Sequence, residues 1–155
     1  MANVARRIDG ASQRIMLALD QEPRATVGWL AEKLGLARGT VQSRIAVLFG
    51  ERTLRPTSTL VHPESLGYSM QAFVTAEVSQ SEFESAMREL VTIPEVLECH
   101  AISGENDLIC HVVAIDAEDL YRVGQRILGC TGIRRTSTSL ILKELIPYRA
   151  AQLMR

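Results

Sequence analysis

The spacing of apolar residues changes once along this 155-residue chain, close to Pro56. Before Pro56 the apolar residues recur at the three- and four-residue intervals of a helix, whereas beyond it short β-rich runs alternate with helical repeats. A helix and a strand bury their apolar residues at different intervals, so the change predicts two modules of different architecture. A content of 46% apolar residues is enough to give both modules a core.

The first module contains three helical repeats separated by turn signals. Pro23 ends the first helix after about Asp20, Thr26 is a suitable N-cap for the second, and Gly35 follows the second where a left-handed residue is favoured. The apolar stripes are Ala11, Ile15, Ala18 and Leu19, then Val27, Leu30, Ala31 and Leu34, then Val41, Ile45 and Leu48. A turn of about three residues that begins with Gly predicts a helix-turn-helix, winged or simple, within residues 1–52.

The second module begins with a predicted strand at 70–78, and Phe83, Met87, Leu90 and Val91 mark a helix after it. The loop SGEND joins two predicted strands at 96–102 and 108–115. A second helix is marked by Leu120, Val123, Ile127 and Leu128, and the stretch 133–146 is rich in β-formers. This order predicts an α+β fold in which residues 63–155 form a ferredoxin-like βαββαβ domain. Residues 53–62 are the expected linker, with 53–60 a short strand that pairs across a dimer.

The segment LICHVVAI at 108–115 is apolar on both faces apart from His111. A strand in a sheet with one face open to water should alternate apolar and polar residues. A partner subunit is the simplest cover for the second face, so we expect a homo-oligomer.

Charge is divided unevenly between the modules. Residues 1–56 hold nine Arg or Lys and five Asp or Glu, a net charge of +4, whereas residues 57–155 hold eight and thirteen, a net charge of −5. A basic nucleic-acid-binding module joined to a sensing or assembly module would show this division, although chance also produces differences of this size.

The N-terminal MANVARRIDG carries charges but no apolar segment typical of export, and no run approaches the roughly 20 apolar residues of a membrane span. We therefore expect a cytoplasmic protein with no membrane partner. Three irregularly spaced Cys residues then suggest reduced thiols rather than a disulfide framework.

Four segments together resemble the Lrp/AsnC, or feast/famine, transcriptional regulators. RATVGWLAEKLGLARGTVQSRI at 24–45 resembles their helix-turn-helix, and VHPESLGY at 61–68, SGENDL at 103–108 and GIRRTSTS at 132–139 resemble their C-terminal module for regulation of amino-acid metabolism. The resemblance implies a dimer that binds double-stranded DNA through the first module. It also implies binding of a free amino acid at subunit contacts of the second module, and often assembly into tetramers or octamers.

The chain departs from the family pattern at several positions. Ala37 stands where the family usually has a Ser cap, and the loss of such a cap typically costs ~1 kcal/mol. Gly39 weakens the first turn of the third helix. Asn106 and Leu108 stand where aromatic residues are common in the effector loop. These departures bear on ligand specificity and on whether an effector binds.

The predicted DNA-side residues are the polar ones that remain when the apolar stripe of the third helix points inward. Arg and Gln pair bidentately with base edges, whereas Thr and Ser more often contact the DNA backbone. The set is Arg38, Thr40, Gln42, Ser43 and Arg44, with Arg24 before the second helix as a phosphate contact. Alternatively, Arg44 packs its stem against the hairpin and Arg24 is a solvated loop charge.

The predicted effector site combines the SGEND loop with two threonines of the last strand. Gly104 permits close approach of the backbone, N–H groups of the loop can hold a carboxylate, and Asp107 can pair with an ammonium group. Thr136 and Thr138 are two residues apart, so their hydroxyls face one side of the strand. The set is Ser103, Gly104, Glu105, Asn106, Asp107, Thr136 and Thr138. The alternative is that these are ordinary turn and strand residues.

Neither a metal nor another cofactor is expected. In Cys99-His100 and Cys110-His111 the Cys and His of each pair point to opposite faces of a strand. At most two of the four side chains therefore converge on one site, whereas a closed zinc site needs four ligands. No nucleophile elbow, phosphate loop or HExxH motif indicates an enzyme. Two alternatives remain: siroheme decarboxylases resemble the same two-module architecture and would use His62, His100 and His111, and a regulator without a ligand would be an architectural DNA-binding dimer.

Overall fold

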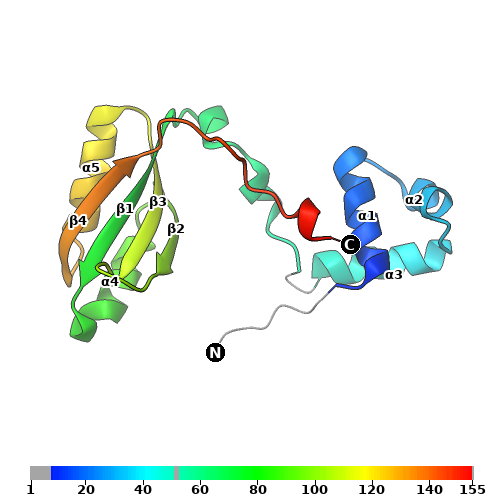
Figure 1. The fold of residues 1–155 in the computed structure, drawn as a ribbon, viewed down its shortest axis with the longest axis horizontal. Helices are drawn as coiled ribbons and strands as arrows, with labels where there is room; N and C mark the ends of the chain where they lie inside the picture. The colour runs from blue at the N-terminus through cyan, green and yellow to red at the C-terminus, as the bar shows by residue number, and fades with distance from the viewer. Residues whose placement is uncertain (1–7, 51–52, 155) are drawn as a thin grey trace. The chain divides into compact units, whose positions relative to one another are not determined.

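The computed structural model describes residues 8–50 and 53–154 and divides the chain into two compact units (Figure 1). One unit runs to Leu60 and also contains the C-terminal stretch from Ile146, and the other is Val61–Leu145. The expected second domain ran to residue 155, so the structure differs in assigning the last ten residues to the first unit. Within that unit the guanidinium of Arg55 lies 4.4 Å from the centroid of the Tyr148 ring, and this contact joins the C-terminal stretch to the linker.

The first unit contains the three predicted helices: α1 (Gly10–Gln21), α2 (Val27–Leu34) and α3 (Arg38–Gly50). Side-chain oxygens of Asp9 and Thr26 accept N–H bonds in the first turns of α1 and α2, and Gly35 ends α2 with a φ of 63°. The buried core is Ile15, Ala18, Leu30, Ala31, Val41 and Leu48. All six belong to the predicted stripes, so the helix-turn-helix is confirmed. Four other stripe residues are partly buried against this core: Leu19, Val27, Leu34 and Ile45.

The linker forms no strand within the single chain. The short 3-10 helix η1 (Thr57–Leu60) lies within it, and a second one, η2 (Pro63–Leu66), follows it directly. A strand that pairs across a dimer needs the backbone of a second subunit to complete its ladder. The cross-dimer strand at 53–60 therefore stays a prediction about the assembled protein.

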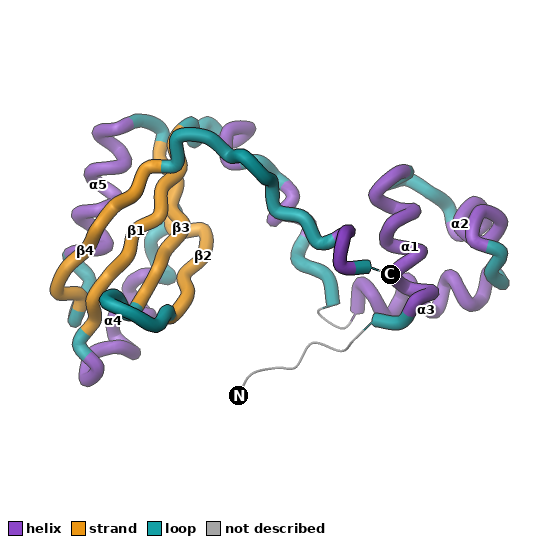
Figure 2. The backbone as a smooth tube through the Cα atoms, in the orientation of Figure 1, coloured by secondary structure: helices purple, strands orange, loops and turns teal. Residues whose placement is uncertain are grey.

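The second unit is a four-stranded antiparallel sheet with strand order β2-β3-β1-β4, as the ferredoxin-like topology requires. Its strands are β1 (Met70–Val78), β2 (Val96–Ala101), β3 (Leu108–Ala114) and β4 (Ile133–Leu140). Its helices are α4 (Phe83–Leu90), preceded by the 3-10 turn η3 (Gln80–Glu82), and α5 (Ala117–Leu128). The predicted α+β fold is confirmed (Figure 2).

Alternation along β1 and β3 defines the two faces of the sheet. Ala72, Val74 and Ala76 are buried with Cys110 and Val112 in one core, to which α4 and α5 contribute Ala86, Leu90, Val123 and Ile127. We call the opposite side the open face. It carries Phe73, which is 40% exposed, and the half-buried Ile109 and His111.

The last strand is shorter than the β-rich stretch 133–146 suggests. Ladder pairing ends where Ala72 faces Leu140, followed by one more bond from the Ile141 N–H to the Gln71 carbonyl oxygen. Because β1 begins at Met70, the chain beyond Ile141 has no neighbouring strand with which to pair. Leu142 and Leu145 are consequently exposed.

Candidate DNA-binding and effector sites

Helix α3 presents a polar face because its apolar residues are committed to the core. Val41 and Leu48 are buried, whereas Arg38, Gln42 and Ser43 are exposed, and Thr40 and Arg44 are half-buried. Ser43 donates its hydroxyl to the Thr40 carbonyl oxygen at 3.0 Å. The structure therefore gathers five of the six predicted DNA-side residues on one helix, and Arg24 is exposed in the turn before α2.

Arg38 lies against the first turn of α2. A Cβ atom built on Gly28 would lie 3.6 Å from the Arg38 Nη2 atom, an ordinary van der Waals contact, so the guanidinium lies directly beside this turn. The N-terminus of a helix carries partial positive charge and unpaired N–H groups. A second positive group beside it makes this corner attractive to an anion such as a DNA phosphate.

Arg44 is already engaged within the unit. Its guanidinium forms an ion pair with Asp9, whose other carboxylate oxygen accepts the Ser12 N–H at the start of α1. Arg44 thereby connects α3 to the N-cap of α1. This contact favours the structural alternative for Arg44, although the partner is Asp9 rather than the hairpin.

The predicted effector loop is the hairpin turn between β2 and β3. Ser103 and Glu105 are exposed, Asn106 is half-buried, and Gly104 has a φ of 126° that favours glycine. Asp107 accepts the Val78 N–H on its Oδ2 atom at 2.8 Å, beside the register shift between Glu77 and Val78. The carboxylate thus compensates a backbone donor that the bulge removes from the ladder.

Thr136 and Thr138 share one face, as predicted, but it is the face that the helices cover. They lie opposite Ala76 and Val74 in the ladder, both of which are core residues. Thr136 approaches Ala76 from one side, while the Asp107 N–H donates to the Ala76 carbonyl oxygen from the other. The loop and the threonines therefore border the same end of β1 but are separated by that strand.

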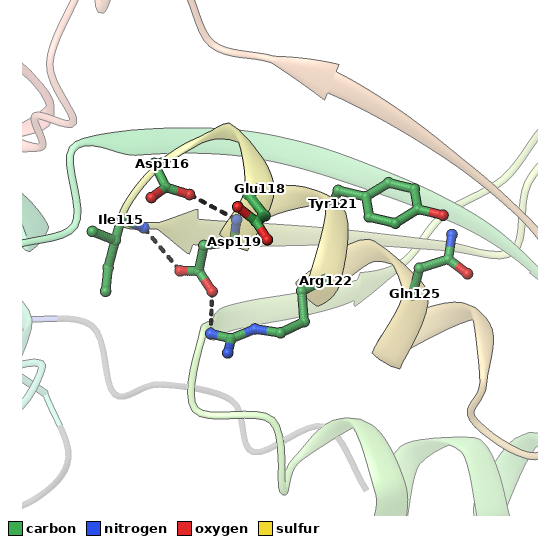
Figure 3. A pocket seen from close by; sticks show the side chains of 7 residues that line it. All are labelled: Ile115, Asp116, Glu118, Asp119, Tyr121, Arg122 and Gln125. Carbon is green, nitrogen blue, oxygen red and sulfur yellow. Dashed lines mark hydrogen bonds and ion pairs between the residues drawn. The ribbon is translucent and has the colours of Figure 1, made fainter.

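Sequence reasoning missed an open hollow of about 510 Å³ at the start of α5 (Figure 3). Asp116 accepts the Asp119 N–H at 2.8 Å, and Asp119 accepts the Ile115 N–H at 2.9 Å and pairs with Arg122. The Ile115 bond is the main reason that the pKa of Asp119 lies below its ordinary value. The sequence D-A-E-D at 116–119 is the capping signal that would have located this turn. The rest of the lining is Glu118, Tyr121 and Gln125.

The Cys and His residues of β2 and β3 separate onto the two faces. Cys99 and Cys110 point to the helix-covered core, whereas His100 and His111 lie on the open face on either side of Glu98. His111 bonds to Gln71 Oε1 at 3.0 Å, and its ring centroid is 5.1 Å from that of Phe73. His62 directly precedes η2. Within residues 8–50 and 53–154, no group of three His, Cys, Asp or Glu side chains is arranged to hold a metal ion.

Across the same described residues, no helix is long and apolar enough to cross a membrane.

Comparison with known proteins identifies both units. Residues 8–48 match the winged helix-turn-helix DNA-binding family, and residues 71–151 match the Lrp/AsnC ligand binding domain. The HTH-type transcriptional regulator AldR of Mycolicibacterium smegmatis is 30% identical over 145 residues, which cover 91% of this chain and 85% of AldR.

Two solved structures share the fold over almost their whole length. Escherichia coli AsnC superimposes with a TM-score of 0.84 at 23% identity, over 94% of this chain and 99% of AsnC. The feast or famine regulatory protein Rv3291c of M. tuberculosis, complexed with L-methionine, gives a TM-score of 0.80 at 28% identity, over 93% of this chain and 98% of its own. With a DNA-binding helix-turn-helix followed by the family's ligand-binding domain, the chain belongs to the Lrp/AsnC family of transcriptional regulators.

Proposed function

We propose that this regulator reads a specific DNA sequence through α3 and responds to a free amino acid bound at subunit contacts of its second unit. The observation that carries the DNA-binding part is the exposed polar face of α3, with the Arg38 guanidinium beside the first turn of α2. A protein that binds chromosomal DNA in this way acts in the cytoplasm. AldR is named as a transcriptional regulator, which supports a non-enzymatic role.

The side chains of the reading face have different proposed roles. Gln42 is exposed and can pair bidentately with an adenine edge, so we assign it to base readout. Arg38 and Arg24 are assigned to phosphates, and Thr40 and Ser43 to positioning on the DNA backbone. Arg44 retains its pair with Asp9 and holds α3 at its angle to α1.

The DNA test measures affinity over a range of salt concentrations for Arg38→Ala, Arg44→Ala and the double variant. Loss of a phosphate contact at Arg38 should lower the slope of log K against log salt by about 0.9. Arg44→Ala should leave that slope nearly unchanged. Arg14→Ala is the matched control, since Arg14 is an exposed arginine of α1 outside the reading face. An unchanged affinity for the folded double variant would exclude α3 from DNA binding.

The effector test is calorimetry with the twenty amino acids, one at a time. The L-methionine complex of Rv3291c supports an amino acid as the ligand class. Asp107→Asn is the informative variant, because its amide oxygen can still accept the Val78 N–H while the negative charge is lost. We expect binding to weaken with no change in melting temperature, and Glu105→Gln in the same loop to bind normally.

Two outcomes would overturn the effector proposal. Binding that Asp107→Asn leaves unaffected would exclude its carboxylate as the ammonium partner. Absence of heat with all twenty amino acids, together with saturable sequence-independent DNA binding, would indicate an architectural protein. An absorbance change on mixing with a tetrapyrrole would instead support the siroheme-decarboxylase alternative.

Homo-oligomerisation is proposed for the open face. Phe73 of β1 and Ile109 of β3 are diagonal neighbours there, since Phe73 lies opposite His111 and Ile109 opposite Thr75, and neither α4 nor α5 packs on that side. Sedimentation should give at least a dimer, and tetramers or octamers would extend the same assembly. Phe73→Glu should shift the protein toward a folded monomer, because it places a charge in the middle of an apolar contact. A monomeric unmodified protein would contradict the proposal.

A further inference from the structure

Cys99 and Cys110 are direct neighbours across the β2–β3 ladder. The Ile102 N–H bonds to the Asp107 carbonyl oxygen and the Val113 N–H to the Glu95 carbonyl oxygen, at 2.9 Å each. These bonds show that the N–H and C=O groups of odd-numbered β3 residues point toward β2. Cys110 is even-numbered, so Cys99 and Cys110 form a non-hydrogen-bonded pair, in which Cα atoms are about 4.5 Å apart. That separation lies inside the range that a disulfide spans.

The two thiols differ in ways that suit a reactive pair. Cys110 is fully buried, whereas Cys99 lies on the edge strand and is half-buried. The neighbouring Cys110 thiol lowers the pKa of Cys99, while the neighbouring Cys99 thiol and burial raise the pKa of Cys110. The more accessible thiol is therefore also the one more easily deprotonated, and a thiolate is the nucleophile in thiol oxidation.

We propose that Cys99 and Cys110 form a reversible intramolecular disulfide when the protein meets a hydroperoxide. In the first step the Cys99 sulfur attacks the peroxide O–O bond, which gives a Cys99 sulfenic acid and releases the first water or alcohol. In the second step the Cys110 sulfur displaces the hydroxyl group of the sulfenic acid. The Cys110 proton leaves with that hydroxyl as water. Two thiols lose two electrons and two protons, and one peroxide gains them.

Backbone geometry makes this disulfide labile. Paired Cβ atoms of a ladder lie about 4.5–5.5 Å apart, whereas a disulfide holds them at about 3.8 Å. Closing the bond draws β2 toward β3, and strained disulfides are reduced more readily than relaxed ones. Because β2 leads directly into loop 103–107, oxidation acts on the segment proposed to bind the effector.

The third cysteine provides an internal control. Cys130 is buried in the same core, donates its thiol to the Arg126 carbonyl oxygen at 3.4 Å, and has a pKa raised mainly by burial. It lies outside the β2–β3 ladder. We expect it to stay reduced under conditions that oxidise the other two.

The experiment treats the reduced full-length protein with equimolar hydrogen peroxide and measures intact mass, thiol content and the linked peptides. We expect a loss of two hydrogen atoms, one remaining thiol of the three in the chain, and a Cys99–Cys110 crosslink that dithiothreitol reverses. Cys130→Ala should form the same crosslink and retain no free thiol. Oxidation of Cys99→Ser should give no intramolecular crosslink. This variant leaves the buried Cys110 unchanged, so it tests the proposal even if Cys110→Ala does not fold.

Three oxidation products would each overturn the proposal: added oxygen on Cys99 without a crosslink, a disulfide that links two subunits, or a crosslink that includes Cys130. Circular dichroism of the oxidised protein shows whether the sheet is retained. Loss of the sheet before the crosslink forms would also contradict the proposal, because it would mean that unfolding exposes the thiols.

Discussion

Gly35 and Gly39 should respond to alanine substitution with opposite signs. Both glycines flank the turn before α3, and no described heavy atom lies within 4 Å of a Cβ built on either one. Gly35 has a φ of 63°, where an L residue costs about 1–2 kcal/mol. Gly39 is inside the right-handed helix α3, where replacing Gly by Ala gains about 0.5–1 kcal/mol. With steric effects equal, only backbone conformation distinguishes the two substitutions.

Urea unfolding followed by tryptophan fluorescence measures this difference, because the only tryptophan, Trp29, lies in α2 of the same unit. For a small unit whose m-value is about 1 kcal/mol/M, Gly35→Ala should lower the midpoint by about 1 to 2 M. Gly39→Ala should raise it by about 0.5 to 1 M. Equal shifts, or a Gly35→Ala variant as stable as the unmodified protein, would refute the argument that conformation sets the cost.

Three further variants test other parts of the structure. Gly132→Ala should lower stability by about 2 to 5 kcal/mol in chemical denaturation, because its φ is 86° and its Cβ would lie 2.6 Å from the Glu82 Cβ; a mild effect would contradict the close packing. Ala37→Ser should raise the fluorescence-detected midpoint by an amount equivalent to ~1 kcal/mol, since it supplies the missing cap of α3, and no gain would mean that the Ser hydroxyl does not reach an α3 N–H. The N–H of Ile115 lowers the folded-state pKa of Asp119. The ionised Asp119 therefore stabilises the folded protein fully above the ordinary pKa of 3.8, and this stabilisation is lost as pH falls through the lower folded-state pKa. Melting temperatures of Asp119→Asn should therefore be lower near neutral pH and converge with those of the unmodified protein in strong acid, and a constant difference would exclude this titration.

Local sequence was sufficient to predict the elements of the fold. The stripes of α1, α2 and α3, the glycine after α2 and the alternation of β1 are repeats within one segment, and each repeat has only one regular conformation that buries it. The open face could be anticipated in the same way, from a strand with apolar residues on both sides. The candidate DNA residues also followed, because the buried positions of α3 leave one side of the helix for the polar ones.

Contacts between distant segments could not be predicted in this way. A spacing of two residues determined that Thr136 and Thr138 share a side, but the pairing of β4 with β1 decided that this is the helix-covered side. Likewise, Arg44 was identified as a polar residue of α3, and only the packing of α1 against α3 brought Asp9 to it.

The sequence by itself therefore determined the order of the helices and of the four sheet strands and most of their buried residues, whereas Val91 and Leu128 of the predicted stripes are exposed. Tertiary structure alone decided which polar side chains are already occupied: Asp107 by the Val78 N–H, Arg44 by Asp9, and Cys99 by its neighbour Cys110. The physical reason is range. Burial patterns repeat within a few residues, whereas a hydrogen bond or ion pair depends on distances of a few ångströms between segments that only the folded chain brings together.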